Sequence, residues 1–395
     1  MDKRNITLLG IGGAGCRIIR QIAGTEGASG IRLLAFDSDL ESLEESGLPP
    51  ENRIVAGMNL RSGRGCGGDE ILGQRAASVE RPRLERILDG TDMLIILGGL
   101  GGGMCTGGLP VVLGVSMKLH ITTMLMLSLP FAMEGYGRRK LADSRICSDL
   151  LPMADCLITL PNDLLFSTLP PETPLVKALE LADREMARSA LALSSILLSG
   201  NLFSADAASF SAVLKRRNAL CSLGVGVAEM DSDSPEESAM EKLLLSPLLG
   251  GPAELSRADA VIFTVLGGPE LSLGKAKHLL ELAGAQLSDS PERKILLGAG
   301  TSPEWDGTLQ LTALTVRYTD TAAAAPAAAA PEIPVQPRSA ARKKTVANGA
   351  FVQQTLALDT EDKGIMDNTT PDIFDGEDLD IPTFKRHGVF VDQGK

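Results

Sequence analysis

The glycine-rich stretch Leu94–Pro110 restricts the folds open to this chain more than any other. The apolar run Met93–Leu97 predicts a buried strand, and seven glycines follow between Gly98 and Gly108. We expect a helix to begin at Pro110, because proline lacks the N–H that is unpaired at a first helical position. Helix N-termini offer free N–H groups and a partial positive charge. The stretch therefore predicts a phosphate cradle, with a tight turn that holds no ligand as the alternative.

A second loop of this kind lies near the N-terminus. The apolar strand Ile6–Leu9 is followed by Gly10-Ile-Gly-Gly-Ala-Gly15 and a helical run from Cys16, with Asp37 further along. This pattern fits the G-x-G-x-x-G fingerprint of dinucleotide enzymes. Alone it would weakly indicate an oxidoreductase, for which we find no hydride-handling residue. Two cradles in one domain instead predict a single nucleotide held between them.

Composition excludes several classes of function. The chain has 395 residues, 44% of them hydrophobic and only 3% aromatic, with a formal net charge of −12. Few aromatics and a negative charge argue against nucleic acid as a partner. The six cysteines show no C-x-x-C pair and no disulfide spacing, which indicates reduced thiols in the cytoplasm. We expect no metal site built by protein ligands alone, no signal peptide and no membrane span.

Short apolar runs alternate with helical stretches up to residue 165, which predicts an α/β fold with a Rossmann-like parallel sheet. Ligands of such sheets bind at the carboxyl ends of the strands, where both glycine loops fall. The expected strands are Ile6–Leu9, Ile31–Phe36, Met93–Leu97, Thr122–Leu127 and Cys156–Leu160, and the expected helices are Cys16–Ala23, Asp69–Ser78 and Arg83–Leu88.

The run Leu175–Leu198 contains neither Gly nor Pro and predicts one long helix. Beyond it we expect a smaller α+β domain. Its predicted strands are Val225–Ala228, Ala260–Leu266, Lys294–Leu297 and Leu309–Val316, with helices at Glu236–Leu245 and Lys275–Ala283. The predicted organisation is a nucleotide-binding domain over 1–173, a central helix over 174–200, a second domain over 201–318, a flexible linker over 319–371 and a tail over 372–395.

The linker is rich in Ala, Pro and charge and cannot bury enough apolar surface to order itself. The tail carries apolar anchors in a charged frame, which is typical of a docking peptide; a solvated tail is the alternative. The anchors are Leu379, Ile381, Pro382 and Phe384.

Two other segments have two interpretations each. Glu134 and Arg138 are four residues apart, so they could form a solvated ion pair or grip a sugar and a base or phosphate. The glycine loop Ser62–Gly68 is either a mobile surface loop or a third ligand contact.

Taken together, these motifs resemble those of FtsZ, the bacterial tubulin homologue of cell division. The resemblance covers both predicted folded domains and the tail. The segments that carry it are Gly99-Leu-Gly-Gly-Gly-Met-Cys-Thr-Gly-Gly-Leu-Pro110, Leu129-Pro-Phe-Ala-Met-Glu-Gly-Tyr-Gly-Arg138, Leu157-Ile-Thr-Leu-Pro-Asn-Asp-Leu-Leu165, Gly65–Asp69, Ser246–Leu249 and Asp378–Arg386.

The resemblance implies the tubulin/FtsZ architecture, binding of GTP and GDP with Mg²⁺, and head-to-tail self-assembly. It also implies a tail-binding partner that is a division protein or a membrane tether. Phosphate contacts would come from Gly12, Gly13, Ala14, Gly15, Cys16, Gly102, Gly103, Met104, Cys105 and Thr106. Glu134, Arg138, Asn162 and Asp183 would face the ribose and guanine.

This chain departs from the family pattern within the implied site. Met104 replaces a threonine, Cys105 replaces a glycine, and Leu179 stands where an aromatic residue usually packs on the base. Cys105 adds bulk where the backbone would approach the ligand.

The largest departure lies in the loop after the central helix. In the family this loop supplies two acids that help to orient the attacking water in the next subunit's site. One register places Asp206 on the first acid and Ser209 on the second. A register anchored on Asn201 places Phe203 on the first acid and Asp206 on the second. One carboxylate is missing either way, so Asp206 is the only catalytic candidate.

We therefore expect an FtsZ-like GTPase with weakened hydrolysis that forms filaments in cell division, in the cytoplasm or at the division site. The alternative is a non-hydrolysing, nucleotide-bound scaffold or regulator of filaments. A dinucleotide oxidoreductase remains a third, weaker hypothesis.

Overall fold

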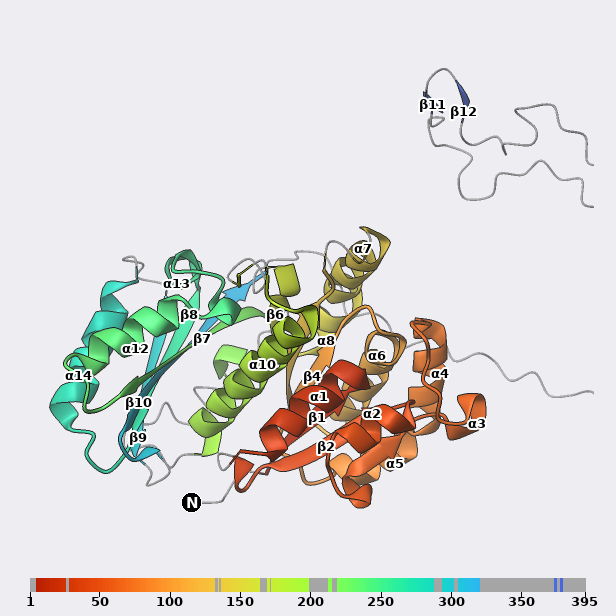
Figure 1. Cartoon of the computed structure of the whole chain (residues 1–395), viewed down its shortest axis with the longest axis horizontal. Helices are drawn as coiled ribbons and strands as arrows, with labels where there is room; N and C mark the ends of the chain where they lie inside the picture. The colour runs from red at the N-terminus through yellow and green to blue at the C-terminus, as the bar shows by residue number, and fades with distance from the viewer. Residues whose placement is uncertain are drawn as a thin grey trace, which may run out of the picture. The chain divides into compact units, whose positions relative to one another are not determined.

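The computed structural model consists of two compact units, residues 1–326 and 327–395. It describes residues 5–25, 28–131, 134, 136–163, 169–170, 172–198, 212–214, 219–287, 293–301, 305–319, 373–374 and 377–378. The first unit spans the residues that the sequence predicts to form the two folded domains (Figure 1). The second unit contributes one short strand pair, β11 (Ile373–Phe374) with β12 (Glu377–Asp378). Most of the predicted linker and tail, including all four anchors, lies outside the described residues.

The N-terminal part of the first unit is a parallel sheet, which confirms the predicted fold class. Neighbouring strands follow the order β3-β2-β1-β4-β5-β6, and each adjacent pair is parallel. The strands are β1 (Ile6–Ile11), β2 (Arg32–Asp37), β3 (Arg53–Val55), β4 (Met93–Gly99), β5 (Thr122–Leu129) and β6 (Cys156–Pro161). The helices are α1 (Gly12–Ala23), α2 (Leu40–Glu45), α3 (Met58–Arg61), α4 (Glu70–Val79), α5 (Arg81–Leu88), α6 (Gly103–Lys118), α7 (Tyr136–Arg145) and α8 (Leu151–Met153).

The same sheet continues into the C-terminal part in the order β7-β10-β8-β9, which makes ten strands among the residues that the structure describes. The pairs β7–β10 and β10–β8 are antiparallel, whereas β8–β9 is parallel. These strands are β7 (Ala219–Glu229), β8 (Ala260–Gly267), β9 (Lys294–Thr301) and β10 (Thr308–Tyr318). The helices are α10 (Leu175–Leu198), α12 (Pro235–Leu244), α13 (Ala253–Arg257) and α14 (Leu273–Ala285).

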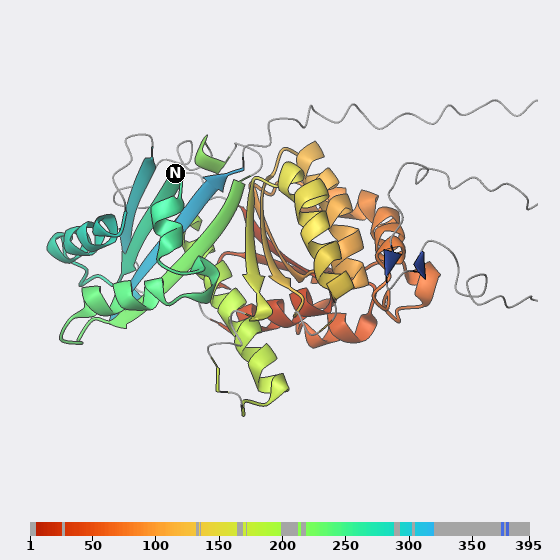
Figure 2. The ribbon, with the colours of Figure 1, turned by 90° about the horizontal axis from the view of Figure 1, so that it is seen from above.

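Helices cover both faces of the parallel part of the sheet (Figure 2). Successive side chains of a strand point to opposite faces, so each strand supplies two cores. In β4, Ile95 and Leu97 face the core under α1 and α10, whereas Leu94 and Ile96 face the core under α4 and α6. Burial on both faces explains why these strands are apolar throughout.

The long helix α10 begins at Leu175 and ends at Leu198, as the sequence predicts. It packs against α1 on one side and β7 on the other (Figure 1). Among the described residues, the sheet crosses from one part to the other through two parallel residue pairs of β6 and β7, Leu157 with Leu220 and Ile158 with Cys221. The boundary predicted between the two folded domains stays a prediction.

The prediction that a helix begins at Pro110 is wrong. Helix α6 begins at Gly103, and Pro110 lies inside it. The sequence misleads here because Gly107 and Gly108 are helical residues that allow close packing, not parts of a loop. A Cβ on Gly107 would come within 1.9 Å of the Glu70 carbonyl oxygen in α4, and one on Gly103 within 2.6 Å of the Asp69 oxygen. Helix α4 therefore requires glycine at these positions.

Candidate functional site

A cavity of about 440 Å³ lies at the carboxyl ends of β1 and β4. Its volume falls within the range of about 300–1,000 Å³ that is typical of small-molecule sites. Both glycine loops line it, through Gly12, Gly13 and Ala14 on one side and Gly101–Cys105 on the other. The open end of an α/β sheet therefore carries a cavity where ligands of such sheets bind.

Two helix N-termini meet at this cavity, and no side chain in the described part of the chain caps either of them. Helix α1 begins directly after Ile11 and α6 directly after Gly102, both without a capping side-chain hydrogen bond. By contrast, the Asp69 carboxylate caps α4 by accepting from the N–H groups of Ile71 and Leu72. First-turn N–H groups without a cap are donors available to an anion, and both helix dipoles favour negative charge there.

The bulky residues of the second loop point away from the cavity. A Cβ on Gly98 would come within 2.7 Å of Cys105 Sγ, which places the thiol against β4. The Met104 methyl group lies over Gly108, within 3.1 Å of the position that a Cβ there would take. Both side chains belong to the buried core under α6. Met104 and Cys105 therefore present mainly backbone to the cavity and leave it open.

The far wall of the cavity contains Glu134, Arg138 and Asn162. Glu134 Oε1 accepts from Phe131 N at 3.0 Å, and Arg138 Nη1 donates to Glu134 Oε2 at 3.1 Å. The predicted ion pair is thus formed, and it is partly exposed. Asn162 differs, because its Oδ1 is buried without a hydrogen-bond partner in the described part of the chain. An unpaired buried oxygen favours a ligand that donates a hydrogen bond there.

Two carboxylates at the end of β2 also line the cavity. Asp37 is buried and Asp39 is half-buried; the Asp37 Oδ1 accepts from Ser38 N at 2.7 Å. Burial raises the pKa of Asp37 to about 6, against the hydrogen bonds from the backbone that lower it. Asp37 therefore titrates close to neutral pH at the wall of the candidate site.

Four of the predicted phosphate and base contacts lie outside the cavity wall. Gly15 brings α1 against the sheet, since a Cβ there would come within 2.5 Å of Leu97 O, and Cys16 is fully buried. Thr106 Oγ1 accepts from Gly101 N at 2.9 Å and so shapes the loop from inside. Asp183 is engaged by another side chain. The predicted ligand contacts of these residues stay predictions.

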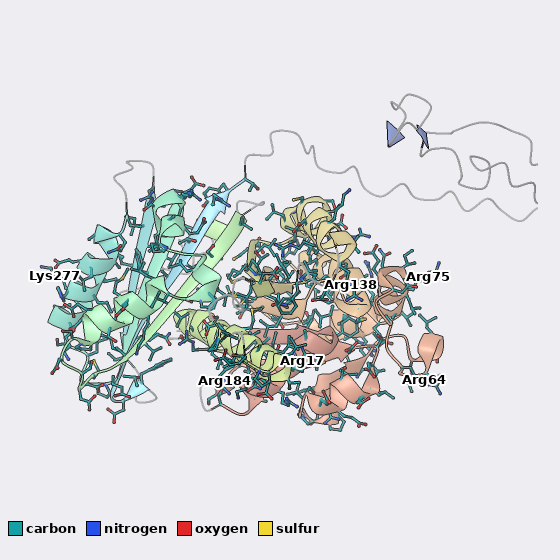
Figure 3. All side chains as sticks on the ribbon, turned by 45° about the horizontal axis from the view of Figure 1, so that its top comes forward. Arg17, Arg64, Arg75, Arg138, Arg184 and Lys277 are labelled. Atoms are coloured by element: carbon teal, nitrogen blue, oxygen red, sulfur yellow. The ribbon has the colours of Figure 1, made fainter. Side chains whose placement is uncertain are left out.

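Asp183 forms an ion pair with Arg17, a residue that the sequence did not single out. Arg17 Nε donates to Asp183 Oδ2 at 2.8 Å, and Arg17 lines the cavity. Burial raises the pKa of the Asp183 carboxyl, while the adjacent guanidinium opposes that rise. Figure 3 labels Arg17 where α1 adjoins α10.

The predicted catalytic residue, Asp206, lies outside the described residues, as do Phe203 and Ser209. Within the described part of the chain no group of three or more His, Cys, Asp or Glu side chains could hold a metal ion. All six cysteines are free, and only Cys147 is exposed.

Comparison with known proteins identifies the family. The GTPase-domain model of the Tubulin/FtsZ family matches residues 5–170. The cell division protein FtsZ 1 of Methanocaldococcus jannaschii is 30% identical over 309 residues, which cover 78% of this chain and 82% of that protein. The chain belongs to the FtsZ family. FtsZ 1 of Pyrococcus furiosus is 29% identical over 80% of this FtsZ-family chain and 82% of its own length.

Solved structures agree with this assignment. An empty FtsZ dimer from M. jannaschii superposes with a TM-score of 0.70 at 29% identity, over 80% of this chain and 89% of that one. The CetZ2 protofilament of Haloferax volcanii superposes with a TM-score of 0.64 at 19% identity, over 80% of this chain and 94% of that one. This similarity shows a shared fold. In the described part of this FtsZ-family chain, every helix is too short or too polar to cross a membrane.

Sequence reasoning missed part of the cavity wall of this FtsZ-family chain. The sequence did indicate Gly65–Gly68, because a ligand contact was one of the two interpretations of the third glycine loop. Leu179 was noted only as a departure from the family pattern. Arg17, Asp39 and Ser42 carry no sequence signal of their own. Asp37 was noted only as part of the first-loop fingerprint. The remaining wall residues that the sequence did not assign are Ile11, Gly99–Gly101 and Ser128–Phe131.

Proposed function

We propose that this FtsZ-family chain binds GTP and GDP in the cavity between α1 and α6, assembles head to tail, and hydrolyses GTP slowly. One observation carries the proposal: two helix N-termini without side-chain caps face one open cavity. A di- or triphosphate would accept from the first-turn N–H groups of both helices, and the two dipoles would stabilise its charge. Asn162 Oδ1, which has no partner among the described residues, supplies an acceptor for a ligand donor in the same cavity.

Mg²⁺ would enter with the nucleotide. This ion keeps several waters and is commonly held by one or two carboxylates together with substrate phosphates. Asp37 and Asp39 are the carboxylates beside the first loop, so they are the candidates to hold it, directly or through water. The ion would neutralise part of the phosphate charge.

Slow hydrolysis follows from the loop that contains Asp206. In a head-to-tail filament this loop would reach the neighbouring subunit's nucleotide and orient the attacking water. Asp206 would do so alone, because both registers lack one acid. Loss of one acid–base group costs about two to four powers of ten in rate. Filaments of this chain should therefore persist longer than those of a two-acid enzyme.

The test is GTP turnover measured against protein concentration, with sedimentation of polymer in parallel. A site completed by a neighbour gives a rate per molecule that rises with assembly. Asp206→Asn should abolish the remaining turnover but leave GTP binding intact. Ser209→Asp should accelerate turnover if Asp206 is the first acid, and Phe203→Asp should do so if Asp206 is the second. A fast rate in the unaltered protein would disprove the missing-acid argument.

The absent carboxylate also favours a second candidate, a non-hydrolysing scaffold or regulator of filaments. That candidate predicts GTP still bound and intact after purification, and no turnover at any concentration. In either case we propose that the tail docks to a division protein or membrane tether through Leu379, Ile381, Pro382 and Phe384. Substituting these four anchors should release the partner without altering GTP binding.

A further inference from the structure

Helix α7 carries part of the cavity wall but has little apolar surface to hold it in place. Arg138 of this helix lines the cavity and is labelled in Figure 3. Among the α7 side chains that the structure describes, only Ala142 is buried. Helices of globular proteins are held mainly by packing of an apolar face. The position of α7 must therefore depend on polar contacts.

Arg145, the last residue of α7, makes such a contact with α4. Its guanidinium donates two parallel hydrogen bonds to Glu70, from Nε to Oε2 at 3.3 Å and from Nη2 to Oε1 at 3.1 Å. The remaining nitrogen, Nη1, donates to Asp149 Oδ2. Asp149 lies in the π turn Ile146–Leu150, which directly follows α7. A bidentate arginine–carboxylate pair is stronger and more directional than a single exposed ion pair.

Glu70 is a fixed anchor for this contact. It is the first residue of α4, directly after the Asp69 cap. Its carbonyl oxygen lies against Gly107 of α6, within 1.9 Å of the position that a Cβ there would take. The start of α4 is thus held against α6, and the third glycine loop, Gly65–Gly68, ends directly before Asp69 in the cavity wall. Arg145 therefore ties α7 to the side of the cavity that the glycine loops form.

Arg138 and Arg145 lie on one face of α7. They are seven residues apart (145 − 138), which is two helical turns, so the two side chains leave the helix on the same side. At one end of this face Arg138 Nη1 donates to Glu134 Oε2 at 3.1 Å, in the cavity wall. At the other end Arg145 holds α4. A rotation of α7 about its axis would break the contact with α4 and move Arg138 in the wall.

We propose that Arg145 is a positioning residue for nucleotide binding, which holds α7 against α4 and so sets Glu134 and Arg138 relative to the glycine loops. This proposal rests on the proposed function, because Glu134 and Arg138 are the expected contacts of the nucleoside. Arg145 itself lies outside the cavity wall and acts through these two residues. The phosphates are bound by the N-termini of α1 and α6, which do not depend on α7.

The experiment compares the affinities of GTP, GDP and inorganic tripolyphosphate, each with Mg²⁺, for the full chain and its variants. Arg145→Met should lower the affinities for GTP and GDP by the same factor, about threefold to tenfold, because the hydrogen bonds of Glu134 and Arg138 to the nucleoside weaken. The affinity for tripolyphosphate, which has no nucleoside, should stay within about twofold. A loss of stability alone would not distinguish between these ligands.

Lys118→Met is the matched control. Lys118 of α6 forms an ion pair with Glu85 of α5 at 2.8 Å, so it also joins two helices, but neither residue lines the cavity. This substitution should leave all three affinities within about twofold. Arg145→Lys keeps the charge but not the forked donors, so it should restore little of the affinity for GTP. Thermal melting of each variant establishes that it is folded, and Arg145→Lys replaces Arg145→Met if the latter is not.

A double-mutant cycle tests whether Arg145 acts through Glu70. Glu70→Gln should also weaken GTP binding, and the double variant should lose no more affinity than Arg145→Met alone, because both substitutions break the same contact. If the two factors multiplied in the double variant, the residues would act independently and the proposed role of the contact with α4 would be wrong.

The other outcomes overturn the proposal in recognisable ways. Equal losses for GTP and tripolyphosphate in Arg145→Met would mean that Arg145 supports the whole cavity. Equal losses of GTP affinity in Arg145→Met and Lys118→Met would reduce the effect to general stability. Unchanged GTP affinity in Arg145→Met would remove Arg145 from nucleotide binding and leave the proposed function intact. Failure of the unaltered chain to bind GTP would instead disprove the proposed function, and this proposal with it.

Discussion

Gly107 of α6 lies directly against the backbone of Glu70 in α4. A Cβ on Gly107 would come within 1.9 Å of the Glu70 carbonyl oxygen, a distance that no folded protein tolerates. A Cβ on Gly73 of α4 would likewise come within 2.0 Å of the Gly103 oxygen. The two helices thus approach each other backbone to backbone, and this approach holds the N-terminus of α6 at the cavity.

Gly107→Ala should destabilise the protein by about 1 to 3 kcal/mol, because backbone cannot yield as a flexible side chain does. Gly114→Ala in the same helix is the matched control. A Cβ there would meet only Arg81, at 3.8 Å, so the change should stabilise the protein by about 0.5 to 1 kcal/mol through helix propensity. Urea unfolding of both variants measures the difference, and equal effects would contradict the close packing.

Gly102→Asp should stabilise the protein slightly and weaken GTP binding. Gly102 is the N-cap of α6 in extended backbone, and a Cβ there would make only an ordinary contact, with the Gly99 carbonyl oxygen at 3.9 Å. An aspartate cap would satisfy N–H groups of the first turn and add a few tenths of a kcal/mol. It would also occupy the anion site and repel phosphate, so GTP affinity should fall by about a hundredfold or more. The melting temperature should therefore rise slightly while the GTP affinity measured by nucleotide titration falls.

Gly102→Ser separates the two effects in that experiment. Serine caps as well as aspartate but carries no charge, so it should weaken GTP binding less. If both variants bound GTP like the unaltered chain, the N-terminus of α6 would not be a phosphate contact.

Cys105→Ala should reduce stability by about 1 kcal/mol, because the thiol is buried in the core against Gly98. GTP affinity should stay within about twofold, since the thiol does not point into the cavity. Denaturant melts and nucleotide titration check the two parts. A large gain in GTP affinity would instead show that Cys105 obstructs the site.

Asp37 should make stability depend on pH near neutrality. Its pKa of about 6 in the folded protein exceeds the unfolded value, so the folded state binds more protons between pH 4 and pH 6. Stability from this carboxyl therefore falls as the pH rises through 6. Asp37→Asn removes that dependence. Relative to the unaltered chain, the variant should gain about 1 to 1.5 kcal/mol between pH 5 and pH 8.

Urea unfolding at the two pH values, with the variant and the unaltered chain side by side, cancels every other titrating group. If the difference in the free energy of unfolding between the two proteins were the same at pH 5 and pH 8, Asp37 would be ionised in the folded protein at both pH values.

Much of this fold was readable from residue patterns. Apolar runs such as Met93–Leu97 and the helix Leu175–Leu198 were placed correctly, because burial and helix propensity act over a few neighbouring residues. The glycine loops also pointed to the edge of the sheet where the cavity lies. The function of individual glycines could not be read in this way, because Gly107 is required by a carbonyl thirty-seven residues earlier in the chain (107 − 70).

The sequence by itself determined the alternation of strands and helices, the family motifs and the position of two glycine loops, since all of these are local patterns. Only the tertiary structure decided which residues face the cavity. It turned Cys105 inward, left Asn162 Oδ1 without a partner among the described residues and joined Arg17 to Asp183. The physical reason is that contacts between α1 and α10, or between α6 and β4, depend on the packing of whole elements across the sheet.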